Sequence, residues 1–410
     1  MFAIAYPVYL HFLGYEIYGL WLVSATVLSL SQLGNFGVRE ALMKFVAEHD
    51  PQEEPARIQE YASTALVLLA AVGALIVAVV TLARGPIVSA FGLSGEPARI
   101  AVWLIPLVAV LSAYLLLVEA LYGVLSGLGR MDQANYAKLL GRITGLVVSI
   151  VALQAGRGVE SLLLGQSIGW LLTHAIVAVC IRRVVGRRLF SRGSVSRKKV
   201  MDLVGFGAPL AGSGLLYLFV GPFNKLMISR FLGLAAVPVF EIAQRGAMEL
   251  RGVLVNGLNA LMPEISASSA RGAWDRIRLI NARSLRLIGL AGGVLYLPVL
   301  LAASFLLHIW LGSRYVEPLA EIFRILFFSS FVSLVGVPAY YTLMGMGRAH
   351  QCMISHVIQA ALSIVIVLGT MWSAFTLTLP VFALSVGFGH LFSTLYLMWQ
   401  TGRALPAMSA

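Results

Sequence analysis

Charged side chains inside a long apolar segment are the residues of this sequence most able to do chemistry. The segment 235–264 carries Glu241, Arg245 and Glu249 at four-residue spacing, so on a helix the three side chains share one face. Ionisable groups within a membrane-length helix are costly unless they face a cavity or a partner. Two interpretations stay open: a ladder of ion pairs that neutralises itself, or a polar face that lines a central cavity.

Four more ionisable residues lie within other apolar segments. Lys225 follows Gly221-Pro222, and it either snorkels to the interface or projects inward from a broken helix. Arg39 and Arg142 lie toward predicted cytoplasmic helix ends, where they snorkel or reach the mouth of a cavity. Glu119 reads as a lone buried carboxylate, and desolvation favours the neutral form of such a group. It is therefore a candidate for proton coupling, with a helix–helix hydrogen bond as the alternative.

Taken together, these residues are more cationic than anionic, which suits an anionic ligand. Arginine matches phosphate particularly well because its planar guanidinium makes paired hydrogen bonds. The candidate substrate-binding residues are Arg245, Lys225, Arg39, Glu249 and Arg142. The candidate ion-coupling residues are Glu119 and Glu241, and no catalytic residue or metal site is predicted.

The elements that position these residues are predicted to be membrane-spanning helices. The chain of 410 residues is 59% hydrophobic and only 12% charged, which excludes a soluble domain. Apolar segments of about 20 residues, each able to cross about 30 Å of hydrocarbon, recur along its length. The predicted helices are a short first one at 1–13, then 17–47, 58–83, 101–126, 134–155, 160–185, 201–231, 235–264, 283–307, 318–344, 350–372 and 378–400. The short first helix suggests a truncated N-terminus.

The net charge of +12 follows the topology rather than pointing to nucleic acid. Basic residues gather in the loops after the sixth and eighth predicted helices, whereas the loops on the other side hold few. Because basic loops stay in the cytoplasm, this pattern places both termini there. Binding of anionic lipid headgroups by these loops is the alternative interpretation.

Two landmarks recur at one spacing and indicate an internal duplication. Phe-Leu-Gly ends at Gly14 and again at Gly233, and we call the separation of these two glycines the repeat spacing. Gly-x-Gly-Arg begins at Gly127 and again at Gly345, which matches the repeat spacing to within a single position.

A duplicated unit of six helices gives both copies the same orientation in the membrane. Transporters built from such repeats bind substrate between the lobes. The predicted organisation is a six-helix lobe at 1–189, a basic linker at 190–199 and a second six-helix lobe at 200–410. The segment 235–264 adjoins this junction, which favours the cavity interpretation.

Motifs of soluble enzymes are missing or misplaced. The sequence has no G-x-x-x-x-G-K-[ST] phosphate-binding loop, and its one G-x-S-x-G match, at 165–169, lies inside an apolar helix rather than a strand–turn–helix. Small residues at this spacing are typical of helix packing, as at Gly123/Gly127, Gly141/Gly145 and Gly289/Gly293. No enzyme and no bound cofactor are predicted.

The sequence also resembles the polysaccharide-exporter and O-antigen flippase family of the multidrug/oligosaccharidyl-lipid/polysaccharide superfamily. The matching stretches are LGYEIYGLW at 13–21, LGNFG at 33–37, FVAE at 45–48, GFGAP at 205–209, MISRFLG at 227–233, LMPEIS at 261–266, and WLG at 310–312 with Tyr315. Their order and spacing cover nearly the whole chain. One departure concerns Lys225, where members of this family often carry aspartate.

The resemblance implies about twelve transmembrane helices in two lobes around a cationic central cavity. It implies a flippase that moves a polyprenyl-pyrophosphate-linked oligosaccharide, such as an O-antigen, lipopolysaccharide or exopolysaccharide repeat unit, across the bacterial inner membrane. The energy source would be a gradient of H⁺ or Na⁺, and the partners would be membrane lipids and the glycosyltransferases and polymerase of the pathway. Two alternatives are a cation-coupled multidrug or metabolite exporter of the related branch, and a non-transporting scaffold for glycan assembly.

Overall fold

The protein is built from α-helices arranged for a membrane. The computed structural model describes residues 2–35, 37–185, 195–212, 215–258, 261–373 and 376–405, and no strand occurs among them. Within these ranges, nine segments are long and apolar enough to cross a bilayer. The predicted class, an all-α polytopic membrane protein, is confirmed. Two compact units make up the chain, Ala3–Leu218 and Phe219–Ala410.

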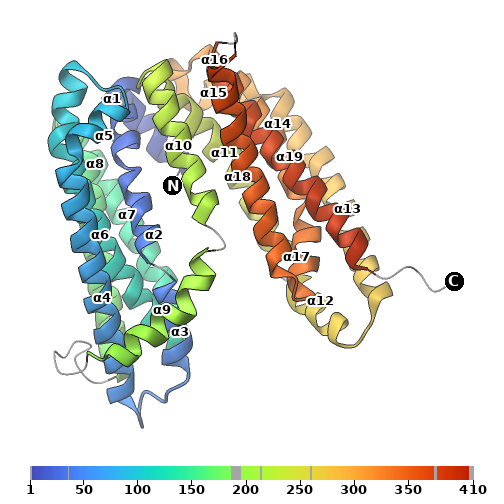
Figure 1. The fold of residues 1–410 in the computed structure, drawn as a ribbon. Helices are drawn as coiled ribbons and strands as arrows, with labels where there is room; N and C mark the ends of the chain where they lie inside the picture. The colour runs from blue at the N-terminus through green and yellow to red at the C-terminus, as the bar shows by residue number, and fades with distance from the viewer. Residues whose placement is uncertain are drawn as a thin grey trace. The chain divides into compact units, whose positions relative to one another are not determined.

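The first unit is a helical bundle organised around one long central helix (Figure 1, blue to green). Its helices are α1 (Phe2–Ser24), α2 (Val27–Gly34), α3 (Val38–Ala47), α4 (Pro55–Leu82), α5 (Arg84–Ala90), α6 (Gly95–Gly127), α7 (Met131–Gln154), α8 (Glu160–Val185) and α9 (Arg197–Gly212). The central helix is α6, which packs against α2, α3, α4, α5, α7 and α8. Its fully buried leucines and alanines are at the centre of the apolar core.

The second unit repeats this plan in the light-green to red part of Figure 1. Its helices are α10 (Leu215–Leu232), α11 (Ala236–Leu258), α12 (Leu261–Ala270), α13 (Trp274–Ala291), α14 (Leu297–Leu301), α15 (Ala303–Leu311), α16 (Glu317–Val335), α17 (Val337–Gly345), α18 (Ala349–Met371) and α19 (Leu379–Ala404). A π-helical turn, Gly292–Tyr296, links α13 to α14. Here α16 is the central helix and packs against α11, α13, α15 and α19.

Each predicted helix corresponds to helical structure, but three are interrupted within the described residues: 318–344 breaks at Gly336, between α16 and α17, and two others break as follows. The predicted helix 17–47 ends and restarts at Ala25–Thr26 and again before α3, where Gly37 has a φ of 69°. The predicted helix 283–307 passes through the π-helical turn just before Pro298. Apolar composition does not reveal such breaks in a helix, because the fragments on either side are as apolar as an uninterrupted helix.

The internal duplication is visible in the backbone. Gly14 and Gly233 both have positive φ, at 68° and 89°, and both separate consecutive helices. Gly129 and Gly347 repeat this at 75° and 76°. The amide that follows each of the latter pair closes the preceding helix in the same way, from Arg130 to Leu125 at 3.1 Å and from Arg348 to Leu343 at 2.8 Å.

Packing between helices follows the same duplication. A Cβ on Gly127 would lie 2.8 Å from the Met43 carbonyl oxygen and 2.8 Å from Val46 Cβ. A Cβ on Gly345 would lie 3.2 Å from the Met262 carbonyl oxygen and 3.0 Å from Ile265 Cβ. Met262 and Ile265 follow Met43 and Val46 by the repeat spacing. Equivalent residues therefore make equivalent helix contacts in the two units.

The G-x-S-x-G match lies within α8, as expected for a packing motif. A Cβ on Gly145 would lie 2.8 Å from the Gly165 carbonyl oxygen, and Gly141 and Gly169 approach each other as closely. Glycines thus bring the backbones of α7 and α8 into contact. Gly289 and Gly293 differ from this prediction, because no atom of the described residues lies within 4 Å of a Cβ placed at either one.

The compact units divide after Leu218 rather than at the predicted linker 190–199. Helix α9 begins at Arg197 and packs on α3 and α4, so it belongs to the first unit. Thr64 Oγ1 accepts a hydrogen bond from the Ser196 amide at 3.3 Å, and Lys199 Nζ lies 3.7 Å from the centre of the Tyr61 ring. The linker's first half, 190–194, lies outside the described residues.

Candidate functional site

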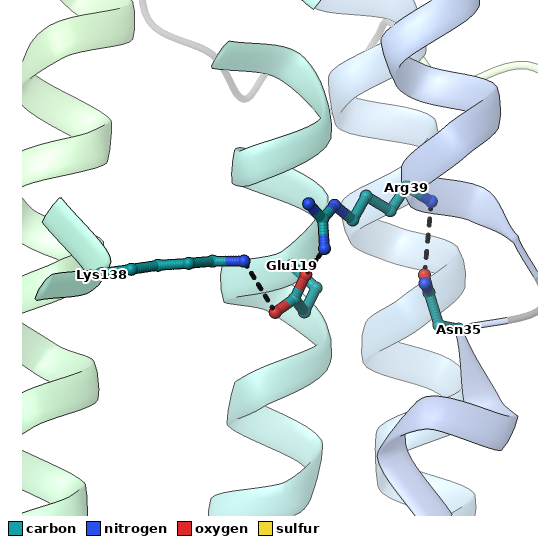
Figure 2. A network of polar contacts seen from close by, with 4 residues as sticks. All are labelled: Asn35, Arg39, Glu119 and Lys138. Carbon is teal, nitrogen blue, oxygen red and sulfur yellow. Dashed lines mark hydrogen bonds and ion pairs between the residues drawn. The ribbon is translucent and has the colours of Figure 1, made fainter. Parts of the chain in front are cut away.

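The first unit holds a cluster of three charged residues, Arg39 on α3, Glu119 on α6 and Lys138 on α7 (Figure 2). We call these three residues the unit-one cluster. Arg39 Nη1 lies 2.9 Å from Glu119 Oε2, and Lys138 Nζ lies 3.7 Å from Glu119 Oε1. The Glu119 carboxylate is only 22% exposed, so one partly buried anion is shared by cations from two other helices.

Glycines bring these helices close enough for the cluster to form. Gly37, with its positive φ, begins α3, and Asn35 Oδ1 accepts a hydrogen bond from the Arg39 amide at 3.3 Å. Gly123 lies one turn beyond Glu119 on α6, and a Cβ there would be 2.7 Å from the Arg39 carbonyl oxygen. The turn at Gly129 then reverses the chain so that α7 returns beside α6. Small residues and two turns therefore set the distances in the cluster.

Positive charge exceeds negative charge around the unit-one cluster. Lys138 Nζ also lies 3.9 Å from the centre of the ring of Tyr122, which is fully buried on α6. Arg142 is one helical turn after Lys138, is exposed, and is near enough for the two charges to interact. Two cations thus contact one carboxylate and Arg142 adds a third positive charge nearby, which leaves an excess of two positive charges.

A second cluster lies in the second unit, across the turn at Gly233. Lys225 Nζ on α10 is 3.3 Å from Glu241 Oε2 on α11, and Arg245 Nε is 3.6 Å from Glu241 Oε1. Glu241 is 11% exposed, whereas Arg245 is 61% exposed. The unit-two cluster, Lys225, Glu241 and Arg245, therefore resembles the first in its chemistry: one buried carboxylate between two cations.

The predicted ladder along α11 forms only in part. Arg245 and Glu241 are paired, but Glu249 is exposed and takes part in none of the ion pairs among the described residues. Arg251, two residues further on, is half-buried, and its Nε donates a hydrogen bond to Ser333 Oγ on α16 at 3.2 Å. No carboxylate in the described part of the chain pairs with Arg251, so its charge is free to bind an anion.

Several candidates sit differently from what the sequence predicts. Glu119 is not a lone carboxylate, because Arg39 and Lys138 both contact it. Lys225 pairs with Glu241, a contact that neither of its two predicted arrangements included. Within their own units the structure brings together Arg39, Glu119 and Arg142, and Lys225, Glu241 and Arg245, leaving Glu249 apart. The binding and coupling roles of these residues stay predictions.

Sequence reasoning missed Lys138 as a site residue and left out Arg251 from the candidates. A simple signal in the sequence would have found Lys138. Residues at about the same distance along the chain before and after the turn between two helices face each other across the helical hairpin. Glu119 precedes Gly129 by ten residues and Lys138 follows it by nine. Lys225 and Glu241 are each eight residues from Gly233. Charges placed symmetrically about a turn glycine therefore predict both pairs.

The fold and these charged clusters define a multi-pass α-helical membrane protein. A family model described as "Polysaccharide biosynthesis protein" matches residues 11–320, so the chain belongs to that family. No curated protein matches the chain. The family prediction made from the sequence is thereby confirmed.

Solved structures share the fold of this chain. An inward-facing MATE family multidrug resistance transporter of the MOP superfamily is 18% identical, with a TM-score of 0.79, over 96% of this chain and 94% of that one. The lipid II flippase MurJ in an inward closed conformation is 11% identical, with a TM-score of 0.72, over 97% and 84%. An outward-facing MATE transporter is 16% identical, with a TM-score of 0.63, over 100% and 92%. At these identities the likeness shows the fold alone.

Proposed function

We propose that this protein flips a polyprenyl-pyrophosphate-linked oligosaccharide across the bacterial inner membrane by alternating access. The observation that carries the proposal is the excess of positive charge around the unit-one cluster, whose Glu119 and Lys138 lie on helices long enough to span a bilayer. Cations at that depth are costly unless an anion compensates them. A pyrophosphate supplies two adjacent phosphates, which suits guanidinium and ammonium groups held a few ångströms apart.

The family and the charge balance together favour a lipid-linked glycan over a cationic drug. A site for cationic drugs needs unpaired carboxylates, whereas Glu119 and Glu241 already hold two cations each. Arg251 adds a further cation in the second unit without a carboxylate partner among the described residues. We expect both termini in the cytoplasm, a gradient of H⁺ or Na⁺ as the energy source, and glycosyltransferases and the polymerase of the pathway as partners.

To test the proposal, we would measure in which leaflet of the membrane the lipid-linked glycan accumulates in cells that lack this gene. Cells without the protein should accumulate the glycan at the cytoplasmic face, and the wild-type chain should restore export. Arg39→Ala and Lys138→Ala should each lower export at least about tenfold, a loss equivalent to one charge-assisted hydrogen bond. Arg99→Ala is the matched control, because Arg99 is 79% exposed and its one ion pair within the described part of the chain is with Glu96, three residues before it.

Either of two results would contradict the proposal. One is normal export without the gene, which would shift the function to drug export or to a scaffold. The other is full export by Arg39→Ala and Lys138→Ala together, which would remove the unit-one cluster from substrate binding. Drug resistance conferred by expression of the chain would support the exporter instead.

The role of Arg251 is tested in the same assay. Arg251→Gln removes the charge while keeping a side chain that can hydrogen-bond to Ser333, and it should lower export severalfold. Ser333→Ala removes only the neutral partner of Arg251 and should leave most of the export intact. Equal export by both variants would contradict a role for the Arg251 charge.

A further inference from the structure

Helix α13 carries two arginines that nothing in the described structure neutralises. Arg283 and Arg286 are three residues apart, so they share a face of the helix, and both are exposed. Neither forms an ion pair with any described residue. The two earlier arginines of the helix differ, because Arg276 pairs with Glu264 at 2.9 Å and Arg278 pairs with Asp275 at 2.9 Å.

The depth of Arg283 and Arg286 follows from the residues after them. The stretch 287–307 contains no charged residue and runs through α13, the π-helical turn, α14 and into α15. At about 1.5 Å per residue, its length is about 30 Å, the thickness of the hydrocarbon layer. Arg286 is therefore the first charge at the edge of the hydrocarbon, and Arg283 lies one turn farther out.

The face that carries these arginines points to lipid. Leu290, on the hydrocarbon side of Arg286, lies on the same stripe of the helix as the arginines and is 67% exposed. The opposite face is formed by buried side chains, at positions 277, 284 and 288. In a membrane protein, exposed leucines contact acyl chains, so arginines on the same stripe lie among lipid headgroups where the hydrocarbon ends.

The duplication provides an internal comparison for this face. At the repeat spacing, Arg283 and Arg286 correspond to Thr64 and Val67 on α4, and neither of these carries a charge. The approach to α4 is acidic, with exposed glutamates at positions 53 and 54 before its start. Arg57 on α4 is the equivalent of Arg276, so only the charges at 283 and 286 are a property of the second unit alone. A signal that served topology alone would be expected at these positions in both units.

We propose that Arg283 and Arg286 bind the phosphate headgroup of an anionic glycerophospholipid. The ligand would come from the leaflet that the positive-inside pattern assigns to the cytoplasm, which is the more anionic one. Two guanidinium groups on one helix face, one turn apart, can each make paired hydrogen bonds with a phosphate. Leu290, on the hydrocarbon side, contacts the acyl chains of the same lipid. This site is independent of the proposed transport of glycan.

The test uses the full-length protein in mixed micelles of phosphatidylglycerol and phosphatidylcholine, with native mass spectrometry as the readout. The measured quantity is the ratio of phosphatidylglycerol to phosphatidylcholine that each protein retains. The double variant Arg283→Gln/Arg286→Gln should lose about tenfold in this ratio. Arg283→Lys/Arg286→Lys should keep most of it, because the charge remains.

The matched control is Arg276→Gln/Arg278→Gln, which removes the same charge from the same helix but from arginines already paired. It should keep a ratio near that of the wild type. An equal loss in both glutamine variants would overturn the proposal, since it would show general attraction rather than a site. Wild-type retention by Arg283→Gln/Arg286→Gln would overturn it as well. Monodisperse elution of each variant checks that the exposed substitutions leave the fold intact.

Discussion

Glu119 shares its carboxylate between Arg39 and Lys138, so it occupies the place that a substrate anion would take in the proposed mechanism. Glu119→Gln keeps the shape of the side chain and removes this internal competitor. A purified Glu119→Gln variant should therefore bind lipid-linked pyrophosphate about threefold more tightly, the equivalent of one partly exposed ion pair. Its thermal stability should fall slightly, because two cations lose their partner. Fluorescence-based binding and thermal unfolding measure the two effects.

Glu119→Asp is the control, because it retains the charge and should bind nearly as the wild type does. Unchanged or weaker binding by Glu119→Gln would contradict the competitor role and leave the carboxylate as a structural pair. The same variant also addresses ion coupling. Transport by Glu119→Gln that keeps its full pH dependence would exclude this carboxylate as the proton carrier.

At the scale of helices, the sequence predicted much more of the fold than of the site. Each apolar segment became helical, because length and apolar composition alone determine a membrane-spanning helix. The breaks at Ala25–Thr26 and Gly292–Tyr296 were not predictable in this way, since the chain is apolar on both sides of each. The partners of Glu119 and Lys225 also needed the packing of neighbouring helices, although the turns at Gly129 and Gly233 already contained the required register.

Gly123 is the residue through which α6 and α3 approach, and it supplies a prediction for these elements. In Gly123→Ala, the new Cβ would lie 2.7 Å from the Arg39 carbonyl oxygen and 3.0 Å from Leu42 Cβ. Helix α3 must then move away, which should destabilise the protein by about 1–3 kcal/mol. The unfolding temperature should fall, and export should fall with it because Arg39 and Glu119 separate.

Gly289→Ala on α13 is the matched control for that substitution. Both glycines lie within helices, but nothing in the described structure is within 4 Å of a Cβ on Gly289. Alanine restricts the unfolded chain and fits a helix, so Gly289→Ala should be neutral or slightly stabilising. Equal unfolding temperatures for the two variants would show that the close approach at Gly123 does not limit stability.

At the scale of the whole molecule, the two units share a fold but carry their charges at different places. At the spacing of the two Gly-x-Gly-Arg landmarks, Glu119 and Lys138 correspond to Val337 and His356 in the second unit. At the repeat spacing, Lys225 and Glu241 correspond to Tyr6 and Leu22 in the first unit. The duplication thus gave both units the same arrangement of helices, and later divergence placed one ion cluster at a different position in each unit. The repeat therefore predicted the architecture but not the site.

An even number of helices per repeat requires that equivalent loops lie on the same side of the membrane. Ser94 and Ser313 are exposed loop residues that the repeat spacing makes equivalent, and Gln52 and Ala270 are exposed near the opposite helix ends. With Cys180 and Cys352 replaced by serine, single cysteines at 94 and 313 should react with a membrane-impermeant maleimide in intact cells. Cysteines at 52 and 270 should react only after permeabilisation, because the positive-inside pattern places them in the cytoplasm. Labelling of 94 and 313 from opposite sides would instead establish inverted repeats, and with them a different geometry of alternating access.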